Sequence, residues 1–179
     1  MTMATGAPIH RVVLITATEP EPRSFGKQVV LGGILDHLCH RLGPDQVHVI
    51  IVGRTGIDRP PVRYQRHVIA KPTAVEQAGA VLQRVVRPPH TSLQEAALWS
   101  ARVLAAIAEQ LAEIRADLQI WDTMRTGQYA RYMGRKPRAL YADDLFSKRY
   151  ASMLDRIDQD QSEVTDPLGE FGKLLPRAV

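Results

Sequence analysis

The chain has 179 residues, of which 45% are hydrophobic and 23% charged, a composition typical of one folded globular domain. Its formal net charge of +4 is modest, and the arginines fall in separate loops, which argues against a nucleic-acid partner and suits an anionic small molecule. Cys39 is the single cysteine, the first nine residues lack a signal-peptide pattern, and no stretch reaches the roughly 20 apolar residues that span a bilayer. We therefore expect a cytoplasmic protein without an internal disulfide.

The first part of the chain reads as a strand, a helix and a second strand. Residues 10–17, HRVVLITA, form a continuous aliphatic run, which is typical of a strand covered on both faces. A proline-rich loop, TEPEPRSFG, leads to a helix over 27–42, whose apolar residues recur at helical spacing. Gly43-Pro44 ends that helix, and QVHVIIVG (46–53) predicts the second strand. Together they predict a right-handed βαβ unit.

The alternation continues through the rest of the chain. We expect strands at 66–71, 118–121 and 139–142, a helix over 74–86, a long helix opened by the capping-box spacing of Ser92 and Glu95, a short helix over 125–133 and a helix over 145–158. This order predicts an α/β fold with a doubly wound, mostly parallel, Rossmann-like sheet. A single domain would cover residues 10–158, followed by a less ordered tail or linker over 159–179.

Polar residues follow several of the predicted strands. Asp143 and Asp144 come after the last strand, Arg125 and Thr126 after the fourth, and Gly26 and Lys27 after the loop that leaves the first. Ligands of such sheets bind at the carboxyl ends of the strands, so these residues predict one cleft.

Each of these residues also has a simpler interpretation. One aspartate of the pair suits a helix N-cap, while the second suits a hydrogen bond from a substrate hydroxyl. Arg125 suits a phosphate or carboxylate, or an ion pair with Asp122 or Asp143. Gly26 either lets an anion approach a helix N-terminus or is an ordinary loop glycine.

Several common sites have no sequence support. The first strand is not followed by G-x-G-x-x-G, and neither a Walker pattern nor G-x-S-x-G occurs. His37 and His40 are three residues apart, but no carboxylate or thiol pattern accompanies them as in a zinc site. We therefore expect neither a cofactor nor a metal.

Longer segments carry a family resemblance. The strand RVVLITA, the loop leading to Gly26-Lys27, the strand VHVIIVG and the segment IWDTMRTGQYARYMGRKPRALYADDLFSKRY, with its acidic turn from Asp143 to Tyr150, cover about residues 10–155. This arrangement resembles the N-terminal domain of GT-B fold glycosyltransferases of the group-1, family-4-like type. Here Lys27 occupies the second position of the family's usual glycine pair.

The resemblance implies the acceptor-binding half of an enzyme that transfers a sugar from a nucleotide-sugar to a glycan or lipid-linked acceptor. Polysaccharide or glycoconjugate assembly would be its setting, with peripheral contact at the inner face of the membrane. Donor binding would belong to a second domain, without which we expect no activity. Carried over by position, the implied substrate-binding residues are Gly26, Lys27, Arg125, Thr126, Asp143, Asp144 and Ser147. The alternative is a stand-alone α/β module that binds an anionic small molecule without catalysis.

Overall fold

The computed structural model describes residues 8–53, 61–86 and 93–142. The chain divides into two units, Met1–Tyr141 and Ala142–Val179, and the helices and strands of the described residues all belong to the first. The predicted domain end at residue 158 and the predicted tail over 159–179 lie outside the described residues. Within the described part of the chain, no helix has the length and apolar character needed to cross a membrane.

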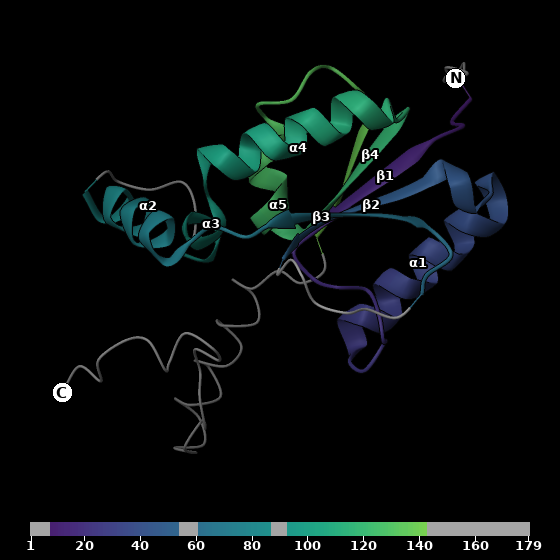
Figure 1. The fold of residues 1–179 in the computed structure, drawn as a ribbon, viewed down its shortest axis with the longest axis horizontal. Coiled ribbons are helices and arrows are strands. Elements are labelled where there is room, and N and C mark those ends of the chain that lie inside the picture. Colours follow the sequence, from purple (N-terminus) through teal and green to yellow (C-terminus); the bar gives the residue numbers. More distant parts are fainter. Residues whose placement is uncertain (1–7, 54–60, 87–92, 143–179) are drawn as a thin grey trace, which may run out of the picture. The chain divides into compact units, whose positions relative to one another are not determined.

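A parallel sheet of five strands forms the centre of the unit (Figure 1). Its strands are β1 (Val12–Thr16), β2 (Val47–Gly53), β3 (Gln65–Ala70), β4 (Leu118–Asp122) and β5 (Arg138–Tyr141), arranged in the order β3-β2-β1-β4-β5. Every neighbouring pair of strands is parallel. The expected doubly wound α/β fold is therefore confirmed.

Helices cover both faces of the sheet (Figure 1). They are α1 (Gly26–Leu42), α2 (Ala74–Val86), α3 (Leu93–Leu98), α4 (Ala101–Ile114) and α5 (Thr123–Ala130), with a short 3-10 turn, η1 (Pro44–Gln46), before β2. Helix α1 packs on one face, whereas α4 and α5 pack on the other. Because β1 is covered on both faces, all five of its residues are buried, which explains its continuous aliphatic sequence.

Side chains of β1, β2 and β4 alternate between two apolar layers. Val13 and Ile15 of β1 pack with Val103 and Ile107 of α4 in one layer. Val12 and Leu14 pack in the other layer, with the α1 residues Leu31 and Leu35 among others. The two-residue period of β1 therefore supplies apolar groups to both faces of the same sheet.

The long helix expected from Ser92 onward is wrong, because the chain forms two helices that are interrupted at Trp99 and Ser100. The Ser100 side chain accepts a hydrogen bond from the N–H of Val103 and so caps a new helix, α4. The hydroxyl of Tyr129, in α5, accepts from the N–H of Ser100 at 3.1 Å and donates to the carbonyl of Leu98. These long-range contacts satisfy backbone groups that a helix break exposes.

Two adjacent glycines of α1 have different surroundings. A Cβ built at Gly32 would overlap the guanidinium of Arg23, whereas one built at Gly33 would meet nothing within 4 Å. Gly32 therefore has a packing role, against a loop arginine rather than against the sheet.

Candidate functional site

The candidate site lies at the carboxyl edge of the sheet between β1 and β4. From β1 the chain crosses to β2 over the α1 face, whereas from β4 it crosses to β5 over the opposite face. The segments leaving these two neighbouring strands therefore diverge. Ligands of open parallel sheets bind at such a switch point.

Asp122 ends β4 at this point, and its residue surface is only 1% exposed. The Nζ of Lys27, from the first turn of α1, lies 3.1 Å from its Oδ1. The Thr16 hydroxyl, at the end of β1, donates to Oδ2 at 2.7 Å. A buried carboxylate is tolerated when it is paired and hydrogen-bonded, and these two contacts supply both conditions. Lys27, Asp122 and Thr16, which we call the switch-point network, thus connect β1, β4 and α1.

The predicted Gly26 and Lys27 both belong to the first turn of α1. Phe25, the residue before the helix, contributes no side-chain cap, and the first turn contains no acidic residue. Backbone N–H groups at such a helix start attract anions. Gly26 is exposed, and a Cβ built there would meet nothing within 4 Å, so Gly26 itself is not required by packing.

The loop between β1 and α1 is held by side chains rather than by its prolines alone. Buried Gln28 donates to the carbonyls of Glu19, at 2.8 Å, and Glu21, at 3.3 Å, and accepts from the N–H of Ser24 at 2.7 Å. The N–H of Thr18 donates to the Thr16 hydroxyl at 2.9 Å. The loop is therefore fixed to both of the elements that it joins.

Arg23 holds the outer part of this loop. Its guanidinium contacts Glu21 at 2.9 Å and forms a two-pronged pair with Asp36 of α1, at 2.7 and 2.9 Å. That guanidinium lowers the pKa of the Asp36 carboxyl. Arg23 also has a left-handed backbone, with a φ of 63°. The role of Gln28 and Arg23 was not predicted, because both depend on loop geometry that periodicity does not encode.

The first turn of α5 contributes Thr126, which is fully buried. Its hydroxyl lies 2.7 Å from the carbonyl of Asp122 and 3.2 Å from that of Ile15, so it connects β4 with β1 beneath the switch-point network. Arg125, next to it, is partly buried. The structure brings both residues to the expected edge, and their contact with a ligand stays a prediction.

Thr123 is the first residue of α5, directly after β4, and has a φ of 61°. A β-branched residue in this left-handed region is an outlier that costs of order 1–3 kcal/mol. It follows Asp122 directly, so strained backbone lies beside the switch-point network.

The remaining predicted site residues, Asp143, Asp144 and Ser147, lie outside the described residues. The strand that precedes them, β5, ends at the same edge of the sheet as β4, since its last residue, Tyr141, is in register with Asp122. Their participation in the site stays a prediction.

Tyr64 and Arg66 are further polar residues that the sequence did not point to. Tyr64 is 7% exposed, and its hydroxyl has no hydrogen-bond partner in the described part of the chain. Burial and the nearby Glu19 carboxylate raise its pKa. Arg66 lies 3.8 Å from Glu19, so the loop after β1 extends to the neighbourhood of β3.

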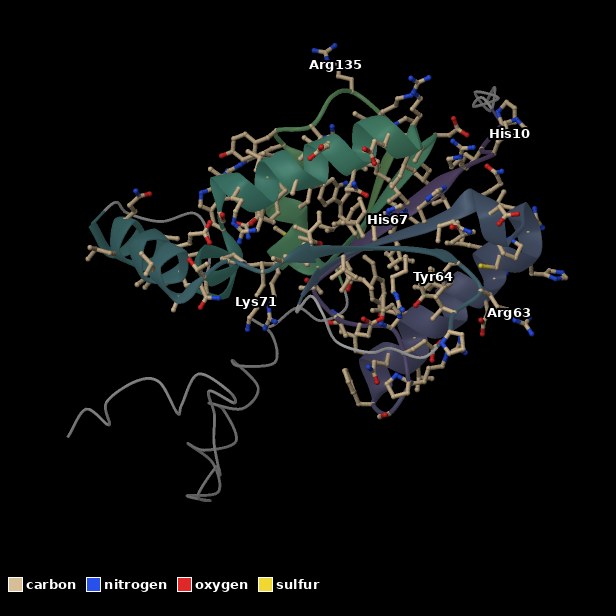
Figure 2. The ribbon with its side chains drawn as sticks, in the orientation of Figure 1. His10, Arg63, Tyr64, His67, Lys71 and Arg135 are labelled. Carbon is tan, nitrogen blue, oxygen red and sulfur yellow. The ribbon has the colours of Figure 1, made fainter. Side chains whose placement is uncertain are left out.

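Two histidines meet on the β2 and β3 strands. Nδ1 of His48 lies 3.2 Å from Nε2 of His67, with the rings stacked 5.4 Å apart (Figure 2 labels His67). Burial, then His67 and Arg11, lower the pKa of His48. Burial also lowers the pKa of His67, whereas Gln110 and Glu113 of α4 oppose that effect. In the described ranges, no group of three or more His, Cys, Asp or Glu residues is arranged to hold a metal ion.

Comparison with protein-family models, with curated proteins and with solved structures gave no match to this chain.

Proposed function

We propose that this domain is the acceptor-binding half of a glycosyltransferase that moves a sugar from a nucleotide-sugar to a glycan or lipid-linked acceptor. The observation that carries the proposal is the switch-point network, where Lys27, Thr16 and Asp122 meet at the β1–β4 boundary. In doubly wound sheets this boundary is where small solutes bind. The sequence resemblance assigns the same edge to the acceptor.

The switch-point network forms a fixed base, or floor, for the site. The charges of Lys27 and Asp122 compensate each other, and the Thr126 hydroxyl donates to the backbone carbonyl of Asp122. Recognition of an acceptor then depends on groups around this floor. We assign hydroxyl contacts to Asp143, Asp144 and Ser147, and a phosphate or carboxylate contact to Arg125, because carboxylates accept from hydroxyls and guanidinium groups pair with oxyanions.

The proposal places the donor nucleotide-sugar on a second domain. We therefore expect acceptor binding, but no turnover, from these 179 residues by themselves. The proposal also includes a cytoplasmic location, with peripheral contact at the inner face of the membrane when the acceptor is lipid-linked.

Backbone NMR of the labelled chain tests acceptor binding. A panel of methyl glycosides and short prenyl phosphates should shift the amides of Gly26, Thr123 and Tyr141, at the carboxyl edge. The double variant Asp143→Asn/Asp144→Asn should weaken binding at least about tenfold, since a hydrogen bond to a charged group contributes about 1.5–3 kcal/mol.

The matched control is Asp45→Asn, an exposed aspartate in η1, before β2, which should leave the affinity unchanged. Acceptor panels that shift no carboxyl-edge amide would refute the proposal. Equal affinity in the double variant would remove the two aspartates from it.

The second candidate is a stand-alone module that binds a small anion. It is favoured by the start of α1, where Phe25 provides no side-chain cap and no acid occupies the first turn. Inorganic phosphate and uncharged methyl glycosides distinguish the candidates in the same titration. Shifts at Gly26 with phosphate alone would support the module, whereas shifts with glycosides support acceptor binding.

A further inference from the structure

Positive charge is concentrated in one stretch of the chain. Residues 123–142 contain five basic residues and no acid, so the rest of the chain must carry a net charge of −1 to give the total of +4. The basic residues are Arg125, Arg131, Arg135, Lys136 and Arg138. The last four occupy the end of α5, the connection to β5 and the start of that edge strand.

These four side chains have no carboxylate partner in the described ranges, although all four residues are exposed. Arg23, Arg66 and Arg102, in contrast, each form an ion pair. Arg135 points away from the ribbon on the connection between α5 and β5 (Figure 2). The charge of this stretch is therefore presented to solvent instead of being neutralised within the fold.

Local contacts shape the stretch without neutralising it. The guanidinium of Arg138 donates to the carbonyls of Met133 and Gly134, which closes the connection. The guanidinium of Arg131 lies 4.8 Å from the centre of the Tyr132 ring. The backbone N–H groups of His10 and Arg11 donate to Oδ2 of Asp117 and lower the pKa of its carboxyl, and the charge of Lys136 adds a smaller effect in the same direction.

Exposed apolar side chains lie among these charges. Tyr132 is 51% exposed and packs against Trp99 with its ring tilted by 42° and the ring centres 5.1 Å apart. Leu140 of β5 is 48% exposed and lies near Gly127 of α5. Because side chains alternate along a strand, Leu140 and Arg138 project from the same face of β5. Basic and apolar groups therefore share one surface.

We propose that this surface, Arg131, Tyr132, Arg135, Lys136, Arg138 and Leu140, is a docking site for a bilayer that contains anionic lipid; we call it the basic surface. Basic side chains are attracted to the negative surface potential, while half-exposed Tyr and Leu side chains enter the interfacial layer. A nucleic acid would satisfy the charges but would give the leucine no apolar environment.

Protection of the sheet edge explains only part of the pattern. Charged side chains on an edge strand discourage pairing with other chains, and Arg138 of β5 fits that role. Arg131, Arg135 and Lys136 precede the strand and are not accounted for by edge protection. Docking to an anionic surface explains all four charges together.

Co-sedimentation of the full chain with vesicles tests the basic surface. Phosphatidylcholine vesicles with about 30 mol% phosphatidylglycerol should bind the protein at about 0.1 M salt, and vesicles of phosphatidylcholine alone should not. The variant Arg135→Gln/Lys136→Gln should lower the partition coefficient about 25-fold, because each cation near the membrane contributes roughly a factor of five. Leu140→Ser should lower the partition coefficient that persists at about 0.5 M salt.

The matched control is Arg41→Gln/Lys71→Gln, which removes the same charge from two exposed positions elsewhere. Its partition coefficient should stay within about threefold of the unsubstituted protein, because Arg41, in α1, and Lys71, after the opposite edge strand β3, lie outside the basic surface. Thermal unfolding of all variants should be unchanged, which separates lost docking from lost folding.

Several outcomes would overturn this proposal: failure to bind anionic vesicles, equal loss in both double variants, or tight binding of a DNA or RNA oligonucleotide without vesicle binding. The assay contains neither donor nor acceptor. A negative vesicle result with positive acceptor titrations would therefore reject the basic surface and the peripheral membrane contact, and leave acceptor binding standing.

Discussion

The Lys27–Asp122 pair predicts a large, non-additive effect on folding stability. Two unit charges 3.1 Å apart attract by about 5 kcal/mol at an effective dielectric constant of about 20. Burial of Asp122 offsets part of that attraction, so the net value of the pair is smaller. Removing Lys27 takes the ion-pair partner from a buried carboxylate, whereas removing the Asp122 charge leaves a partly exposed lysine, so the two substitutions differ in cost.

Lys27→Met should be the more harmful single substitution. It leaves the Asp122 carboxylate, which is 1% exposed, with a hydrogen bond from the Thr16 hydroxyl but without its ion-pair partner, and breaking a buried pair in this way costs about 3–5 kcal/mol. Asp122→Asn leaves a lysine whose side chain is 21% exposed and can turn toward water, so we expect a cost of about 1–2 kcal/mol.

The double variant Lys27→Met/Asp122→Asn should be more stable than Lys27→Met alone, with a coupling energy of about 2 kcal/mol in the cycle. Urea unfolding of all four proteins measures these values from the transition midpoints and slopes. Additive effects, or a cost below about 1 kcal/mol for Lys27→Met, would refute the view that this pair fixes the floor of the site.

Three further predictions concern other parts of the domain. Gly33→Ala should raise the free energy of unfolding by about 1 kcal/mol, because alanine favours the helix more than glycine does and its added methyl group meets no other atom within 4 Å. Gly32→Ala should not be stabilised, because its methyl group would overlap the Arg23 guanidinium, which must then move. A stabilised Gly32→Ala variant would contradict the contact between Gly32 and Arg23. The histidine pair should make the free energy of unfolding fall as the pH drops from about 7.5 to about 5.5. Both pKa values are lowered in the folded protein, so the unfolded chain takes up protons first. In the variant His48→Gln/His67→Gln the difference between the urea midpoints at these two pH values should therefore be smaller. Tyr129→Phe should cost about 1–3 kcal/mol in urea unfolding, because its hydroxyl satisfies two backbone groups between α3 and α4; an unchanged midpoint would show that another group replaces it.

The sequence predicted the sheet well because its strands are local apolar runs. The first strand was expected at 10–17 and is β1 at Val12–Thr16, and the second was expected at 46–53 and is β2 at Val47–Gly53. The helix expected at 74–86 has those bounds in α2. In these segments local propensity, hydrophobic period and tertiary burial agree.

Local pattern failed where the decisive contact was distant. Nothing within residues 92–114 requires a break, because no glycine or proline interrupts the helical period there. The break at Ser100 depends on the hydroxyl of Tyr129, which is 29 residues away. Asp122 was considered as a partner of nearby Arg125, yet the structure pairs it with Lys27, which comes beside it only when α1 crosses the sheet.

The pairing of Lys27 with Asp122 and the exposed charges of the basic surface predict different salt dependence for acceptor binding and for membrane docking. At the carboxyl edge the Lys27 charge is compensated by Asp122, so long-range attraction of an anion there depends mainly on the start of α1. On the basic surface, Arg131, Arg135 and Lys136 have no compensating acid in the described part of the chain. Uncompensated charges act over about a Debye length, whereas a buried pair acts by holding neighbouring groups in place. We therefore expect salt to weaken membrane docking strongly and acceptor binding only slightly, and parallel titrations at about 0.1 M and about 0.5 M salt should separate the two processes.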